Sequence, residues 1–106
     1  MNNTRTHSLT FRLTLGPEHA SRHPLRHKKD RAREVLVDFS NGEGAHACFV
    51  SSVHDSLGGR KVWAVFDERG ADLPGISASV HSTRKSALAA VARWVEDVTG
   101  MSEAGV

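Results

Sequence analysis

Regular alternation of apolar and polar residues marks the first predicted strand, residues 8–15. Its apolar residues share one parity: Leu9, Phe11, Leu13 and Leu15. Since successive side chains of a strand point to opposite faces, this pattern predicts a strand with one buried and one wet face. Gly16 and Pro17 follow, and proline cannot donate to a ladder, so we expect the strand to end there.

Similar patterns, rich in β-branched and aromatic residues, predict more strands further along the chain. They cover residues 34–40, 45–53, 61–67 and 76–80. Asn and Gly accept positive φ, so residues 41–44 (NGEG) predict a hairpin between the first two of these segments. Residues 68–70 and 72–75 contain the glycines and proline typical of turns.

A helical period follows the last predicted strand. One face of this helix carries most of its large apolar residues: Ala87, Leu88, Val91, Trp94, Val95 and Val98. Ser82 or Thr83 is expected to cap its start, because a hydroxyl can accept an unpaired backbone N–H. Gly100 is expected just after its last turn.

These elements predict a small α+β fold, an antiparallel meander of about five strands with one C-terminal amphipathic helix on one face. A chain of 106 residues is expected to form one domain, residues 1–106, with a frayed tail at 101–106. The expected core has the following members: Leu9, Phe11, Leu13, Val37, Phe39, Val62, Ala64, Phe66, Leu88, Val91 and Val95.

Composition is that of an ordinary globular protein, with 39% hydrophobic and 25% charged residues. No apolar run is long enough to predict a membrane span, and residues 1–10 lack the apolar centre of a secretion signal. The single cysteine, Cys48, has no partner for an internal disulfide. We therefore expect a cytoplasmic protein that does not contact membranes.

Positive charge is concentrated between residues 22 and 33, although the whole chain carries only +2. This segment holds one acid, Asp30, and six cations: Arg22, Arg26, Lys28, Lys29, Arg31 and Arg33. Residues 16–33 show no apolar period and include Pro24, so they predict a flexible basic loop. Such a loop is suited to neutralising phosphates. It contains no aromatic residue that could stack on a base.

The predicted helix starts with two cations, Arg84 and Lys85, where the helix dipole favours negative charge. Free N–H groups at a helix start attract an anion, so these cations indicate a second polyanion contact. Arg60 and Lys61, at the start of the predicted strand 61–67, are expected to assist.

Trp63 leaves two interpretations open. If Val62, Ala64 and Phe66 face the helix, then Trp63 and Val65 form an apolar patch on the opposite face, suited to a partner protein. The reverse register places Trp63 in the core.

Neither catalysis nor metal binding is predicted. His19, His23 and His27 are spaced by four, but Pro24 interrupts any helix that would align them as ligands. His46 and Cys48 would share one side of a strand, yet a buried cysteine beside a surface histidine is the commoner arrangement. No glycine pattern typical of nucleotide cofactors is present, so no cofactor is expected.

Residues 61–98 resemble two families. The segment KVWAVFDERG, followed by a short strand and STRKSALAAVARWV, resembles the N-terminal DNA-binding domain of phage-type integrases, which implies a sheet that contacts DNA. The segment DLPG, followed by Ser82, Thr83 and an alanine-rich helix, is similar to antitoxins of the HicB type. That likeness implies a partner protein.

The leading hypothesis is a small non-enzymatic binding protein, of the kind found as regulators in phages or plasmids, that contacts nucleic acid or a nucleoprotein. The alternative is a protein–protein inhibitor or antitoxin-like adaptor that works through a sheet edge or through Trp63. The oligomeric state stays open, with a homodimer among the alternatives.

Overall fold

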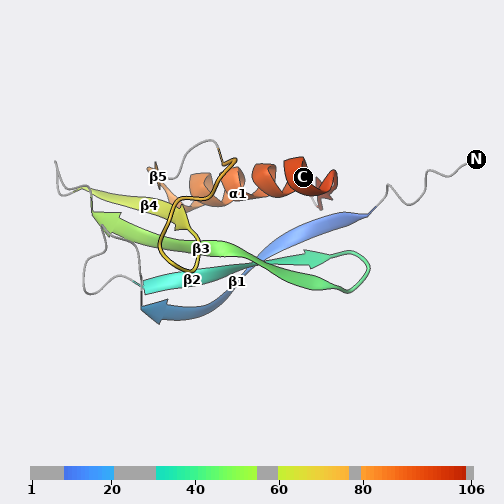
Figure 1. Cartoon of the computed structure of the whole chain (residues 1–106), viewed down its shortest axis with the longest axis horizontal. Helices are drawn as coiled ribbons and strands as arrows, with labels where there is room; N and C mark the ends of the chain where they lie inside the picture. The colour runs from blue at the N-terminus through green and yellow to red at the C-terminus, as the bar shows by residue number, and fades with distance from the viewer. Residues whose placement is uncertain (1–8, 21–30, 55–59, 77–79, 105–106) are drawn as a thin grey trace, which may run out of the picture.

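The computed structural model describes residues 9–20, 31–54, 60–76 and 80–104, which form one sheet and one helix (Figure 1). The elements, in chain order, are β1 (Thr10–Ala20), β2 (Arg31–Phe39), β3 (Gly44–His54), β4 (Lys61–Phe66), β5 (Val80–His81), α1 (Arg84–Thr99) and β6 (Ser102–Glu103). The sheet order is β5-β4-β3-β2-β1-β6. The predicted α+β class is confirmed.

Strands β1 to β5 form the predicted antiparallel meander, and β6 adds a sixth strand that the sequence did not predict. It pairs parallel to β1 at Thr10 and Phe11. The backbone N–H of Ala104 also donates to the carbonyl of Phe11 at 2.7 Å. Residues 102–104 are therefore tied to the sheet, and the expectation of a frayed tail is wrong for them.

The first strand continues through Gly16 and Pro17 instead of ending there. Its register with β2 shifts between Leu15 and Glu18, so glycine and proline occupy a bulge. An added Cβ at Gly16 would lie 3.3 Å from the Cβ of Glu34, so only glycine fits this close approach without displacement. The predicted loop 16–33 is correspondingly shorter, and only residues 21–30 of it lie outside the described part of the chain.

The predicted hairpin and helix caps are confirmed. Gly42 has a positive φ of 92° at the tip between β2 and β3. Thr83 caps α1, because its hydroxyl accepts the backbone N–H of Ser86 at 3.0 Å. Gly100 ends the helix in the left-handed region, with φ 74°, and its N–H donates to the carbonyl of Glu96.

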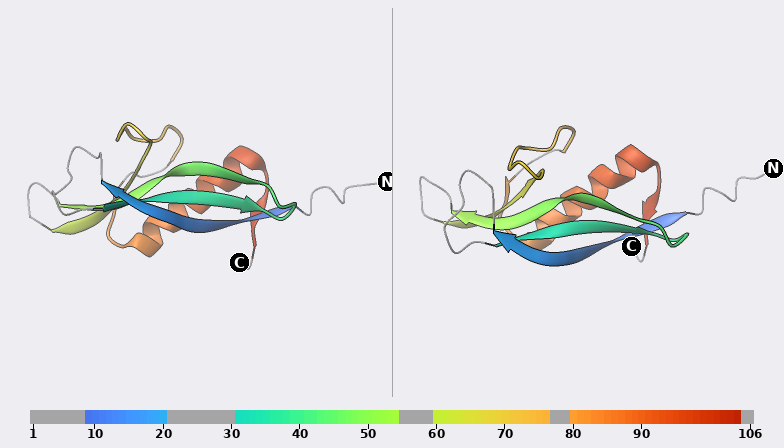
Figure 2. Two further views of the ribbon diagram at one scale, coloured as in Figure 1. Left: turned by 90° about the horizontal axis from the view of Figure 1, so that it is seen from below. Right: turned by 60° about the horizontal axis from the view of Figure 1, so that its bottom comes forward.

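Figure 2 shows α1 lying obliquely across one face of the twisted sheet. The helix buries Ala87, Val91, Ala92 and Val95. Val98 was expected on this face but is 70% exposed, since the apolar stripe rotates away from the sheet near the helix end.

The core is divided into two clusters on opposite faces of the sheet. The cluster beneath α1 contains Phe11, Val35, Val37, Cys48, Val50, Val65 and the buried helix residues. The cluster on the other face contains Ala32, Val53, Val62, Ala64 and Phe66, with Phe49 packed against it.

The predicted core residues of β4 are therefore buried, but on the face opposite to the one expected. Val62, Ala64 and Phe66 point away from the helix. Val65 and Trp63 pack with the cluster beneath α1. The sequence left two registers open for β4, and the structure has the one that turns Trp63 toward the helix and the core beneath it.

No helix among the described residues is long and apolar enough to cross a membrane.

Candidate polyanion interface at one end of the sheet

Strand register brings three of the predicted cationic segments to the same end of the sheet. Ala20 pairs with Arg31, Ser52 pairs with Trp63, and Trp63 pairs with His81. In the antiparallel pair of β2 and β3, Ala32 pairs with Ser51, so Arg31 lies opposite Ser52. These pairs therefore form one continuous row across β1 to β5. At this end β1 finishes, β2 and β4 begin, and α1 starts three residues after His81 (Figure 1).

Trp63 is the point where two of these cations meet. The Lys61 Nζ atom lies 5.5 Å from the Trp63 ring centroid, and the Arg84 Cζ atom lies 5.7 Å from it. Both distances allow a cation–π interaction. Two residues that are 23 positions apart in sequence (61 and 84) thus flank one indole.

The other predicted site residues are distributed around this pair. Arg31, Arg60 and Lys85 are exposed. Arg33 is only partly exposed, because its Nε donates to the carbonyl of Gly16 at 3.0 Å and holds the side chain along the bulge of β1. Arg33 therefore stabilises the bulge, and it is the member of the predicted set least suited to contact a ligand.

The remaining four predicted cations, Arg22, Arg26, Lys28 and Lys29, lie outside the described residues. Their segment joins Ala20 to Arg31, which are register partners at this end of the sheet. Both attachment points of the basic segment therefore belong to the row of paired residues that contains Trp63.

The helix start has the charge order expected from the sequence. Its first turn contains no acid, and its last turn contains no cation. Thr83 satisfies one of the free N–H groups, while Arg84 and Lys85 stay exposed beside the others. The positive end of the dipole and these two side chains thus reinforce each other.

Acidic residues gather at the opposite end of the described molecule. That end contains the β2–β3 hairpin, the last turns of α1 and strand β6. Its acids are Asp38, Glu43, Glu96, Asp97 and Glu103. Acids therefore outnumber cations at this end, where Arg12 pairs with Asp38, and an anionic ligand is favoured at the end of the sheet that carries Trp63.

The apolar patch of Trp63 and Val65, expected if Val62, Ala64 and Phe66 faced the helix, is not formed. Val65 is fully buried beneath α1. Trp63 is half-buried, on the helix side, and flanked by Lys61 and Arg84. Alternate residues of β4 are apolar on both faces of the sheet, and its register turns Trp63 and Val65 toward the helix.

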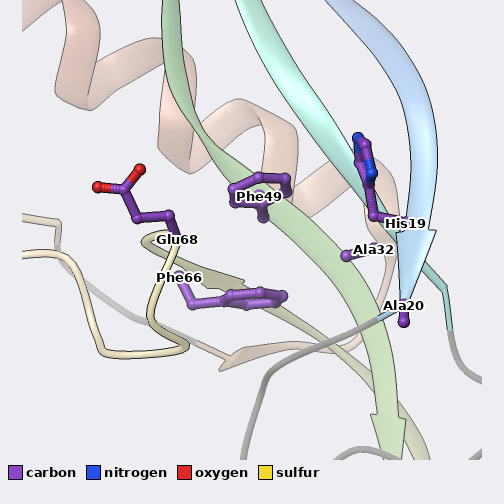
Figure 3. A pocket seen from close by; sticks show the side chains of 6 residues that line it. All are labelled: His19, Ala20, Ala32, Phe49, Phe66 and Glu68. Carbon is purple, nitrogen blue, oxygen red and sulfur yellow. The ribbon is translucent and has the colours of Figure 1, made fainter.

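A pocket that the sequence did not predict lies on the face opposite α1 (Figure 3). Its volume is about 470 Å³, and its described lining is His19, Ala20, Ala32, Phe49, Phe66 and Glu68. The Phe49 and Phe66 rings are nearly parallel, with centroids 6.1 Å apart. Phe49 and Phe66 come together because they are register partners on β3 and β4. This pairing cannot be read from the sequence alone.

Cys48 and His46, the pair considered for catalysis, do not face one another in the structure. Burial raises the pKa of the Cys48 thiol to about 12. His46 does not share its side of the strand, since a bulge opposite Val35 and Leu36 separates the two residues. Cys48 faces the cluster beneath α1, whereas the His46 ring contacts Phe49 and its Nδ1 lies 2.7 Å from Glu34 Oε2.

Asp67 shapes the turn after β4. Its Oδ1 accepts the backbone N–H groups of Arg69 and Ala71 at 2.8 and 3.0 Å. The bonds from Ala71 and Arg69 lower the pKa of this carboxyl, because they stabilise its charged form. Across the described part of the chain, no three His, Cys, Asp or Glu residues are grouped closely enough to hold a metal ion.

Comparisons with protein families, with curated proteins and with solved structures found no match for this chain. The resemblances of residues 61–98 to integrase and antitoxin domains therefore stay predictions.

Proposed function

We propose that this protein is a non-enzymatic binding protein that contacts nucleic acid or a nucleoprotein through the end of the sheet that carries Trp63. The observation that carries this proposal is the meeting of Lys61 and Arg84 on one indole ring. Arg31, Arg60 and Lys85 extend the same basic end, which we call the Trp63 end.

The arrangement favours binding because the cations are held in place before a ligand arrives. A cation over an indole face gains about 0.5–1 kcal/mol at an exposed site and keeps its N–H groups free to donate. Holding long side chains in one position reduces the entropy that is lost on binding. Phosphates are the anions best matched to several such donors spread over one surface.

The cytoplasm is the compartment that we propose. A single cysteine that is buried and unpaired is compatible with a reducing environment.

Salt-dependent binding tests the proposal. Binding of duplex DNA and of single-stranded RNA would be measured across about 50–300 mM salt, where released counterions give a linear log–log plot. We expect the double variant Lys61→Gln, Arg84→Gln to reduce both the affinity and the slope of that plot.

The matched control is the double variant Arg12→Gln, Arg93→Gln. It removes the same charge from exposed side chains near the start of β1, where Arg12 pairs with Asp38, and on α1, away from the Trp63 end. Equal losses in both variants would mean that only net charge matters and would contradict a defined interface. No binding at the lowest salt would refute the proposal.

A protein partner is the second candidate, and one observation favours it. Within the described residues, the outer side of β1 is paired only at Thr10 and Phe11, by β6. An open strand edge can accept a strand from another chain. This mode predicts binding that is insensitive to salt and to the Lys61, Arg84 variant, and analytical ultracentrifugation would show whether a second copy is the partner.

A further inference from the structure

In its described lining, the pocket opposite α1 has an aromatic floor and two polar side chains, His19 and Glu68. Phe66 and Ala32 are 1% and 2% exposed, and Phe49 is half-buried above them. The Phe49 and Phe66 rings are tilted by only 17°, and the His19 ring meets Phe49 edge-on at 6.1 Å. Figure 3 shows these rings in front of the sheet, with α1 behind it.

The shape and lining suit a flat aromatic ligand. A volume of about 470 Å³ lies within the range of small-ligand sites, about 300–1,000 Å³. The Phe49 ring, which the His19 and His46 rings also contact, borders the pocket and can pack against a planar ring. The Glu68 carboxylate at the rim can accept a hydrogen bond from an amino group. The described lining residues are aromatic or small, apart from the Glu68 carboxylate.

The pocket lies close to the Trp63 end along the sheet. His19 and Ala32 line it and are register partners, and the next partners along the strands are Ala20 and Arg31. Phe66 is three residues beyond Trp63 on β4, a separation of about 10 Å along a strand. The pocket and the cations on Trp63 are on opposite faces of the sheet, so one ligand that reaches both must bend around its end.

A single nucleic-acid strand meets these requirements. Its backbone is flexible and carries a phosphate at every nucleotide, and its unpaired bases have flat faces and free amino groups. A duplex does not meet them, since its bases are stacked and paired within the helix.

We infer that the pocket receives one base of a single-stranded nucleic acid whose phosphates contact the cations of the Trp63 end. Phe49 supplies the stacking surface, and Glu68 favours bases with an exocyclic amino group, namely adenine, cytosine or guanine, over thymine or uracil. This inference rests on the proposed function and specifies its ligand.

The test uses single-stranded oligonucleotides of about 12 residues, within the length that single-strand-binding domains occupy. Each carries one 2-aminopurine, whose fluorescence changes when the base leaves its neighbours and stacks on another ring. The same sequence annealed to its complement is the duplex probe. Both are titrated with the wild-type protein and with Phe49→Leu, which keeps apolar volume and removes the ring.

The matched control is Phe39→Leu, because Phe39 is also half-buried but packs beneath α1 near the acidic end. We expect wild type to prefer the single strand by about tenfold, in line with stacking of one base. Phe49→Leu should lose that preference and the fluorescence change, while Phe39→Leu keeps both. Glu68→Gln should reduce the preference for adenine over thymine.

Three outcomes would overturn the inference. Equal affinity for single strand and duplex, unchanged by Phe49→Leu, would leave the polyanion interface intact and remove the base pocket. Binding of free 2-aminopurine riboside without binding of any oligonucleotide would assign the pocket to a small molecule. No binding of either probe at the lowest salt would overturn the proposed function together with the inference.

Discussion

Reversing one charge at the start of α1 should stabilise the fold and weaken ligand binding at the same time. Lys85 is exposed in the first turn, where the dipole favours negative charge. Lysine and glutamate have similar helix propensities, so Lys85→Glu changes mainly the electrostatic energy. Arg84 is a poorer choice for this test, since its guanidinium also contacts Trp63.

The expected gain follows from the dipole. Removing an unfavourable charge and adding a favourable one should raise the free energy of unfolding by about 0.5–1.5 kcal/mol at low salt. For a domain near this size, each kcal/mol shifts the melting temperature by about 4–8 °C. The gain should shrink in high salt, because exposed charges are then screened.

Binding should change in the opposite direction. If Lys85 contacts a phosphate, Lys85→Glu should lower the slope of the log–log salt plot by about one and weaken all sequences alike. Differential scanning calorimetry and fluorescence anisotropy on the same samples would measure the two effects.

Asp97→Lys is the control for the dipole. Asp97 is exposed in the last turns of α1, where a cation is favoured, so this change should stabilise the helix without reducing affinity. A destabilised Lys85→Glu protein would refute the electrostatic reasoning. Unchanged binding by that variant would refute the role of Lys85 in the interface.

Three further predictions concern stability. Burial raises the pKa of the Cys48 thiol from 9.0 to about 12, so its contribution to the free energy of unfolding is fully present below pH 9.0 and is lost as pH rises through about 12. Alkaline denaturation should therefore be less steep for Cys48→Ala. The lowered pKa of Asp67 matters in acid, because its contribution to the free energy of unfolding is present above the ordinary value of 3.8 and is lost as pH falls through the folded value. In acid titrations followed by circular dichroism, the stability of Asp67→Asn should therefore depend less on pH. Gly100→Ala should cost about 1 kcal/mol in urea denaturation, because alanine is disfavoured at a φ of 74°, whereas an equal cost for Gly44→Ala, at a position without positive φ, would contradict this reasoning.

The sequence predicted elements whose signals are local. Both caps of α1 were predicted because Thr83 and Gly100 act on their immediate neighbours. The hairpin at Gly42 was predicted for the same reason. These signals are independent of the rest of the fold.

Features that depend on pairing between distant segments were missed or left open. In β4 both parities are apolar, so alternation could not assign Trp63 to a face. Strand β6 has no strand pattern of its own, since Ser102 and Glu103 are polar, and it forms because β1 offers an open edge. Pro17 is tolerated within β1 because the bulge leaves it without a register partner in β2.

The candidate site shows the same division. The sequence identified Lys61 and Arg84 as cations, but their meeting on Trp63 depends on the order β3-β4-β5 and on where α1 starts. The pocket depends on a register that places Phe49 opposite Phe66.

The bulge at Gly16 and Pro17 has a consequence for how the protein behaves when concentrated. An open strand edge is a template for aggregation, and β1 presents one along most of its length among the described residues. Pro17 has no N–H to offer an incoming strand, and the bulge interrupts the regular spacing of the remaining groups. Arg12, Thr14 and Glu18 add polar and charged side chains. The bulge thereby interrupts the edge and disfavours continuous pairing with a strand of a second copy.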